Sequence, residues 1–271
     1  MIAGIFFEGS GLGDQLFRYI TVRTLAEKKG FEWGILNPNS FKGDGFLNIE
    51  KGKEVPNDFY ELKMGMGSFA PHPKAWNEKE VRDANGVDIR SYDPEINFVE
   101  DNTIIDGSFE DSKYWRHNLS NISKWLSVEP LNVPNDLCVV GFRGGEYASQ
   151  PDLFLTDDYW MHAFKMLKDL HLHPQVHTDD PILAKQKWPG FEIIDNEQIN
   201  HSKHSNMGFN WRSARYAKYA IIPNSAFFIL PRLLKHFEDP SAITIAPRYW
   251  ARRNTKTWAR PACYYPEFTY L

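Results

Sequence analysis

The residues best suited to chemistry form one segment near the middle of the chain, Gly141-Phe142-Arg143-Gly144-Gly145-Glu146-Tyr147. The apolar run 137–142 predicts a strand, which places Arg143 at the carboxyl end of that strand, where open α/β sheets bind ligands. The flanking glycines let a ligand approach the backbone, and a guanidinium can form paired hydrogen bonds with phosphate oxygens. The alternative is a surface arginine that pairs with Glu146. The strand-end position favours ligand binding.

Two more loops follow predicted strands. His177-Thr178-Asp179-Asp180 comes after a strand at 174–178, and Pro223-Asn224-Ser225 after a strand at 219–222. Aspartates can accept hydrogen bonds from ribose hydroxyls or base N–H groups, while a serine at a helix N-terminus is both a cap and a phosphate ligand. Each loop alone is explained as a cap. Three such loops on one rim predict a nucleotide site.

A glycine loop, Gly9-Ser10-Gly11-Leu12-Gly13, lies between a strand predicted at 2–7 and a helix predicted to end near Gly30. Such a loop lets the backbone approach a ligand, so Gly11 and Gly13 are candidate ligand-binding residues. A nicotinamide fingerprint is not met, because Asp14 stands where its third glycine would be. A tight turn with no ligand explains this loop equally well.

Alternating elements predict an α/β protein of two Rossmann-like lobes. Strands at 31–36 and 103–105 and a helical stripe from Trp115 to Leu126 complete the first lobe, and the interval 37–100 is predicted to be irregular. Two prolines in 128–135 indicate a boundary, giving a first lobe at 1–129 and a second lobe at 130–271. The remaining elements predicted for the second lobe are strands at 191–194 and 242–246 and helices at 157–169, 181–187, 209–217 and 225–236.

The composition excludes several classes of protein. The 271 residues carry a net charge of −4, which gives no basic excess for binding nucleic acid. No long apolar run and no signal peptide are recognised, so we expect a cytoplasmic protein, with peripheral association with a membrane left open. Two cysteines exclude a disulfide framework, and the histidines lack zinc spacing, so no metal is expected. The aromatic-rich end, 249–270, is expected to serve packing, although Trp250 and Trp258 could line an acceptor groove.

Five segments in this order resemble the bacterial alpha-1,2-fucosyltransferases, which belong to a larger group with the alpha-1,6- and protein O-fucosyltransferases. Gly9–Tyr19 is similar to that family's G-x-L-G-N-Q-M-F-Q-Y segment, and Asp106–Trp115 resembles its G-x-x-Q-S-x-K-Y-F segment. Gly141–Tyr147 occupies the place of the H-x-R-R-G-D-Y motif, His177–Asp180 that of S-D-D, and Ile222–Phe227 that of I-A-N-S-S-F.

The resemblance implies two facing Rossmann-like lobes of the GT-B type, with the acceptor on the side of the first lobe, 1–129, and GDP-fucose held mainly by the second, 130–271. The implied activity is metal-independent, inverting transfer of L-fucose from GDP-fucose to a galactoside hydroxyl, with a nucleotide sugar and a glycan acceptor as partners and no cofactor. Arg143 would stabilise the departing GDP with help from loop 9–13. The other assigned residues are Asn224 and Ser225 at the pyrophosphate, Asp179 and Asp180 at guanosine, and Glu146 and Asp14 as candidate bases.

The family motifs are not fully kept. Gly141 and Gly144 stand in place of the motif's histidine and second arginine, and Asp14 in place of an asparagine. Two alternatives therefore stay open: a transferase for another GDP-sugar, and a catalytically silent descendant that binds nucleotide or glycan.

Overall fold

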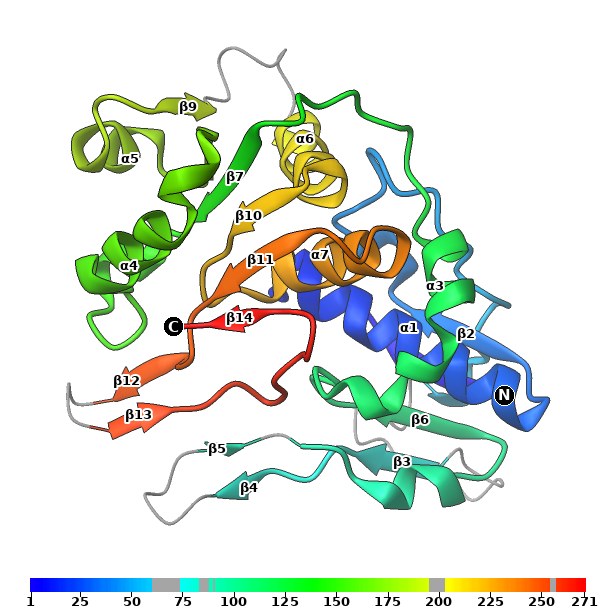
Figure 1. Cartoon of the computed structure of the whole chain (residues 1–271). Helices are drawn as coiled ribbons and strands as arrows, with labels where there is room; N and C mark the ends of the chain where they lie inside the picture. The colour runs from blue at the N-terminus through cyan, green and yellow to red at the C-terminus, as the bar shows by residue number, and fades with distance from the viewer. Residues whose placement is uncertain (60–73, 83–87, 90, 195–202, 254–256) are drawn as a thin grey trace. The chain divides into compact units, whose positions relative to one another are not determined.

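The computed structural model describes residues 1–59, 74–82, 88–89, 91–194, 203–253 and 257–271. The chain divides into two compact units, Met1–Ser127 and Val128–Leu271 (Figure 1). This division falls two residues before the boundary predicted at 129/130. The donor and acceptor roles assigned to the two lobes stay predictions.

The N-terminal unit is built on a four-stranded parallel sheet in the order β2-β1-β6-β3. Its strands are β1 (Ile2–Ile5), β2 (Trp33–Leu36), β3 (Lys74–Asn77) and β6 (Thr103–Asp106). The prediction of an irregular interval at 37–100 was wrong at β3, which completes the sheet beside β6. A short antiparallel pair, β4 (Val81–Arg82) and β5 (Asp88–Ile89), lies outside the sheet.

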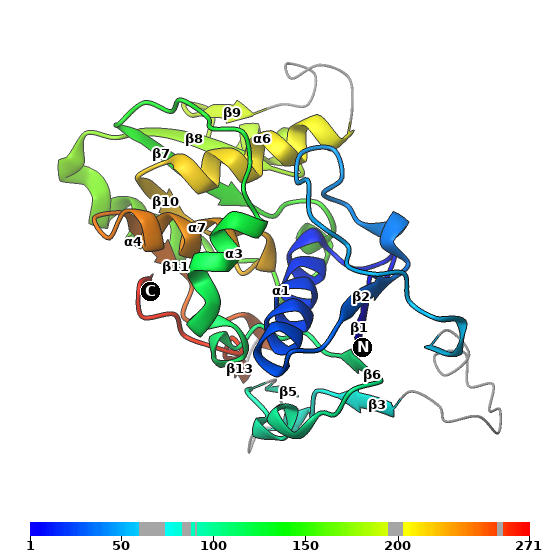
Figure 2. The same ribbon diagram turned by 90° about the vertical axis from the view of Figure 1, so that its right-hand side faces the viewer.

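Helix α1 (Leu12–Lys29) packs against β1 and β2 (Figure 2). Its first turn is capped by Asp14, whose carboxylate accepts the Gly11 N–H at 3.2 Å. It ends at Gly30, which adopts a φ of 70° that an L residue rarely takes, with two lysines in the last turn opposing the helix dipole. Towards Leu126, where a helical stripe was predicted, the chain instead forms two 3₁₀ turns and then α3 (Leu119–Trp125).

The C-terminal unit is built on a six-stranded sheet, all parallel, in the order β14-β11-β10-β7-β8-β9 (Figure 1). Five of these strands were predicted, and β14 was not. The strands are β7 (Leu137–Phe142), β8 (His173–Thr178), β9 (Glu192–Ile194), β10 (Tyr219–Ile221), β11 (Ile243–Ala246) and β14 (Thr269–Tyr270). A separate antiparallel hairpin, β12 (Ala251–Arg253) and β13 (Thr257–Ala259), precedes β14.

Helices connect the strands from β7 to β11, as in a doubly wound sheet, whereas the β12–β13 hairpin lies between β11 and β14. For three of the four helices, the observed range differs from the predicted one by a few residues at one or both ends. The ends of a helix are less clearly indicated by the sequence than its middle. The helices are α4 (Asp157–Leu167), α5 (Pro181–Lys187), α6 (Lys203–Tyr216) and α7 (Ala226–Glu238).

Aromatic side chains fill the space between β7 and the helices that follow it. The ring of Phe142 meets those of Trp160 and Trp188 at 6.0 and 5.1 Å between centroids. Tyr159, on the first turn of α4, is buried and donates its hydroxyl to the carbonyl of Ile222 at 2.6 Å. This bond joins α4 to the carboxyl end of β10, so the position of the helix is fixed relative to that strand.

Arg232, on α7, is fully buried and donates five hydrogen bonds. They reach the carbonyls of Ala214 and Ala217 at the end of α6, and those of Lys218 and Ile243 where β10 and β11 begin. The fifth goes to the hydroxyl of Thr244. Burial lowers the pKa of Arg232 to about 9, and the carbonyls of the helix end compensate part of the lost hydration.

We expect Arg232→Met to lower the free energy of unfolding by about 3–5 kcal/mol, because several buried carbonyls lose their donor. Urea unfolding followed by circular dichroism measures this. The matched control is Arg260→Met at an exposed position, which should change stability by less than about 0.5 kcal/mol. A similar small effect at both positions would contradict the structural role of Arg232.

Candidate functional site

The strand order creates a switch point between β7 and β10. From β7 the chain adds β8 and β9 on one side of the sheet, then returns to add β10, β11 and β14 on the other. Ligands of open α/β sheets bind in the crevice at the carboxyl ends of strands at such a point. The three loops singled out in the sequence follow β7, β8 and β10, so they share this edge.

Arg143 lies at this edge in a cluster of charges. Its Nη1 contacts Asp179 Oδ2 at 2.7 Å, and its Nη2 contacts Glu146 Oε1 at 3.2 Å. The guanidinium lies over the ring of Tyr147, 5.0 Å from its centroid. The buried Nε has no hydrogen-bond partner among the described residues. The structure therefore brings Arg143, Glu146 and Asp179 together, and includes the pairing with Glu146 that the sequence left open.

The two aspartates after β8 are engaged by the protein itself. Asp179 also accepts the Gly144 N–H at 2.9 Å, and Asp180 caps α5 by accepting the Leu183 N–H at 3.0 Å. The turn packs closely on them: a Cβ at Gly144 would lie 2.6 Å from the Cβ of Asp180. Glycine is thus required here for the approach of the two loops.

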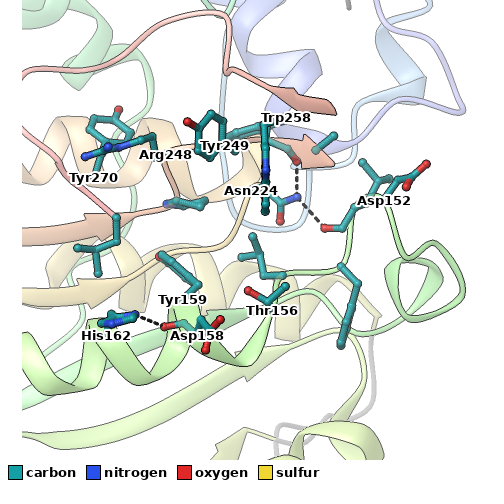
Figure 3. Close-up of a pocket in the computed structure, with 17 residues that line it drawn as sticks. Asp152, Thr156, Asp158, Tyr159, His162, Asn224, Arg248, Tyr249, Trp258 and Tyr270 are labelled. Atoms are coloured by element: carbon teal, nitrogen blue, oxygen red, sulfur yellow. Dashed lines mark hydrogen bonds between the residues drawn. The ribbon is translucent and has the colours of Figure 1, made fainter. Parts of the chain in front are cut away.

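A pocket of about 520 Å³ opens at the same edge, on the side of β10, β11 and β14 (Figure 3). Its walls come from the loop before α4, the first turns of α4, the loops after β10 and β11, the β12–β13 hairpin and the last strand. The lining residues are 152–156, Asp158, Tyr159, His162, Asn224, 247–251, Trp258, Tyr270 and Leu271. Of the residues proposed from sequence, Asn224, Trp250 and Trp258 line it; the Arg143 cluster does not.

Asn224 joins two walls of this pocket. Its amide nitrogen donates to the carbonyls of Leu153 and Trp250 at 2.8 and 2.6 Å, while its Oδ1 is buried with no hydrogen-bond partner among the described residues. The next residue, Ser225, is the N-cap of α7 without forming a side-chain capping bond. Both residues therefore keep an oxygen that a ligand could use.

The other predicted residues lie in the N-terminal unit. Gly11 is the N-cap of α1, Gly13 is buried in its first turn, and Asp14 caps the same turn. Sequence reasoning missed Arg18, which contacts Ser10 Oγ at 3.1 Å and Asp106 Oδ1 at 3.4 Å. The position of Arg18 on the predicted helix, close after the glycine loop, could have indicated it as a candidate.

Sequence reasoning also missed most of the pocket. Asp158 and His162 were expected only as part of a helix, and Tyr249 as packing. Within the described ranges, no group of three or more histidine, cysteine, aspartate or glutamate side chains is placed to hold a metal ion. Among the same residues, no helix is long and apolar enough to cross a membrane.

His177 belongs to the core of the C-terminal unit. It is fully buried on β8, with Nδ1 2.8 Å from Asn210 Oδ1, Nε2 2.9 Å from Gln175 Oε1, and its ring stacked on Phe209. Burial lowers the pKa of its imidazole to about 4, so the ring is neutral at pH 7. Its buried side chain therefore supports the carboxyl end of β8 from within the core.

Comparison with known proteins gives a likeness in fold. No family model and no curated protein matches the sequence. A mutant of Arabidopsis thaliana FUT1 in complex with GDP superposes with a TM-score of 0.51 and 10% identity, covering 96% of this chain and 73% of that one. NodZ alpha-1,6-fucosyltransferase soaked with GDP-fucose (TM-score 0.48, 14% identity, 86% and 91% covered) and Escherichia coli heptosyltransferase WaaC with ADP (0.45, 13%, 100% and 92%) are less similar in fold.

The predicted fold is confirmed. The chain is an α/β protein with two Rossmann-like units of the GT-B type, each built on a parallel sheet. At 10% identity this likeness concerns the fold, and the activity needs an argument from the site.

We expect the protein to lose stability as the pH falls from 6.5 to 4, in part through His177. The unfolded chain binds a proton at this histidine near pH 6.5 and the folded chain only near pH 4, so acid favours unfolding by up to about 3 kcal/mol. In urea unfolding at a series of pH values, His177→Gln should show a shallower decline, whereas the exposed His171→Gln should follow the wild type. Parallel curves for all three proteins would contradict the assignment.

Proposed function

We propose that the protein is an inverting glycosyltransferase that moves L-fucose from GDP-fucose to a galactoside hydroxyl without a metal ion. The observation that carries the proposal is the position of Arg143 on a glycine turn at the switch point of a parallel sheet, next to the loop that starts α7. Charge that develops on a departing diphosphate needs fixed donors at such a place. An arginine fork and the N-terminus of α7 supply them.

The ion pairs of Arg143 suggest how a diphosphate would enter. Asp179 is the closer partner and also accepts the Gly144 N–H, so it holds the guanidinium in place. Glu146 is farther and two-thirds exposed, so its pair with Arg143 is weak. A diphosphate would replace Glu146 at Nη2. The released carboxylate would then be available as a base for the acceptor hydroxyl.

Glu146 is the better of the two candidate bases. The carboxylate of Asp14 already caps α1 through the Gly11 N–H, whereas the contacts of Glu146 are exposed. The fold shared with Arabidopsis FUT1, solved with GDP, supports a guanine nucleotide as donor. We propose the N-terminal unit as the acceptor side, and Ser225 and loop 9–13 as further donor contacts.

A second candidate function is a silent binding module. It is favoured by the balance of charge at Arg143, which faces two carboxylates in place of the second arginine of the family motif. Thermal shift with GDP, UDP, ADP and GDP-fucose, followed by a GDP-release assay, separates the candidates. Stabilisation by GDP without turnover on any galactoside indicates the silent module. Turnover with a different GDP-sugar indicates the other transferase.

We expect Arg143→Ala to lower kcat by roughly 10²–10³, about 3–4 kcal/mol, because one electrostatic donor to the leaving group is lost. Arg143→Lys should restore little, since a point charge does not reproduce the planar fork. GDP release from GDP-fucose measures both variants, and thermal unfolding confirms that they are folded. If Arg143 served only surface pairing, the change would cost less than about 1 kcal/mol, and near-normal turnover would overturn the catalytic role.

Glu146→Gln separates the two roles of Glu146. Removing the competing charge should tighten GDP binding by about threefold, while loss of the base should reduce turnover by about 10²-fold or more. Calorimetric titration with GDP and the release assay measure the two effects. Glu110→Gln, a glutamate of the N-terminal unit outside this cluster, is the control. Unchanged turnover in Glu146→Gln would remove Glu146 from the reaction.

A further inference from the structure

The pocket beside the switch point has a chemistry different from that of the Arg143 cluster. Its volume, about 520 Å³, falls within the range of small-molecule pockets, about 300–1,000 Å³. None of its lining residues belongs to the Arg143 ion-pair cluster. It therefore calls for a ligand group other than the diphosphate.

Asn224 offers a fixed hydrogen-bond acceptor in this pocket. The side chain is 2% exposed, and its nitrogen is committed to the carbonyls of Leu153 and Trp250. Turning the amide over would set its oxygen against both carbonyls, so Oδ1 must face the other way. Figure 3 shows this amide within the pocket lining, beside Trp258. A buried acceptor without a partner among the described residues favours a ligand that brings an O–H or N–H donor.

Aromatic rings form one wall. The rings of Tyr249 and Trp258 lie 4.9 Å apart between centroids, and Trp258 is 46% exposed. A large aromatic face held open to a pocket suits a flat or weakly polar ligand surface, such as the C–H face of a sugar ring or a nucleobase. The aromatic wall alone does not choose between them.

The charged residues of the pocket distinguish between a sugar and a nucleotide. Asp152 and Asp158 contribute two carboxylates, Arg248 one cation, and His162 donates its Nδ1–H to the Asp158 carbonyl at 2.8 Å. The two aspartates and the arginine together carry a net charge of −1, which repels a nucleotide diphosphate. Carboxylates are good acceptors for hydroxyl groups. A neutral ligand rich in hydroxyls and with one apolar face meets all of these features.

We propose that this pocket binds a neutral pyranose ring of the acceptor glycan. One hydroxyl donates to Asn224 Oδ1, others donate to Asp158, and the apolar face of the ring stacks on Trp258. The role as acceptor rests on the proposed function, whereas the binding of sugar does not. The C-terminal unit thereby contributes to acceptor recognition, in addition to the N-terminal unit.

The test is saturation-transfer NMR and tryptophan fluorescence with a panel of methyl galactoside, glucoside, mannoside and fucoside, on the whole chain. We expect at least one glycoside to bind, and Trp258→Ala and Asp158→Asn each to weaken it about tenfold. Two matched controls lie outside the pocket. Asp157→Asn removes the neighbouring carboxylate, which pairs with Lys187, and Phe237→Ala removes an exposed ring of α7. Both should bind within about twofold of the wild type.

GDP is titrated into the same proteins. Sugar binding that depends on Trp258 and Asp158, with GDP affinity unchanged in both variants, supports the pocket assignment. The assignment is overturned if no glycoside binds, if binding survives Trp258→Ala and Asp158→Asn, or if these variants lose GDP instead, which would make this the nucleoside site. Glycoside binding with no GDP response and no transfer would reject the proposed function and leave the sugar pocket standing.

Discussion

A buried arginine that pairs, within the described part of the chain, with carbonyls and a hydroxyl and with no carboxylate is the constraint on which the C-terminal unit depends. Arg232 donates hydrogen bonds to carbonyls at the end of α6 and at the starts of β10 and β11. It therefore fixes these two strands and this helix relative to one another. Leaving the buried carbonyls and the guanidinium without hydrogen bonds would lower the free energy of unfolding substantially. With the amino ends of β10 and β11 set, their carboxyl ends, two and three residues further on, are placed where the loops must form the ligand edge.

That edge divides into two chemical environments. On the β8 side, Arg143 and its carboxylates make a charged cluster in which a diphosphate must compete with Glu146. On the β11 side, Asn224 and the aromatic wall make a largely apolar pocket. The loop after β10 belongs to both, because Asn224 lines the pocket and Ser225 begins α7. A single short loop thus lies where two different ligand groups would meet.

The sequence was sufficient to predict most of the alternating strands and helices. It was insufficient to predict which side chains pair with one another. Runs such as 137–142 mark a buried parallel strand clearly, because every residue in them is apolar. Strand β14 has only two residues, Thr269 and Tyr270, and β3 follows a proline-rich stretch, so neither has a readable pattern. The contact of Asp179 with Arg143 joins the loops that follow two separate strands, β8 and β7. The order of strands predicts that the two loops lie close together. Whether Arg143 forms an ion pair with Asp179 or stays free to contact a ligand depends on local packing, which the sequence does not reveal.

The order of strands also governs how the C-terminal unit can fold. Strand β7 is made first, yet its partner on one side, β10, pairs Cys138 with Tyr219, about 80 residues later. Closing so long a loop is entropically costly, and folds with distant pairings form slowly. Until β10 arrives, the fully apolar run Leu137–Val140 has an unpaired edge open to other chains. The sheet that builds the ligand edge therefore carries an aggregation hazard in its folding intermediates, and refolding at low protein concentration or with a chaperone is favoured.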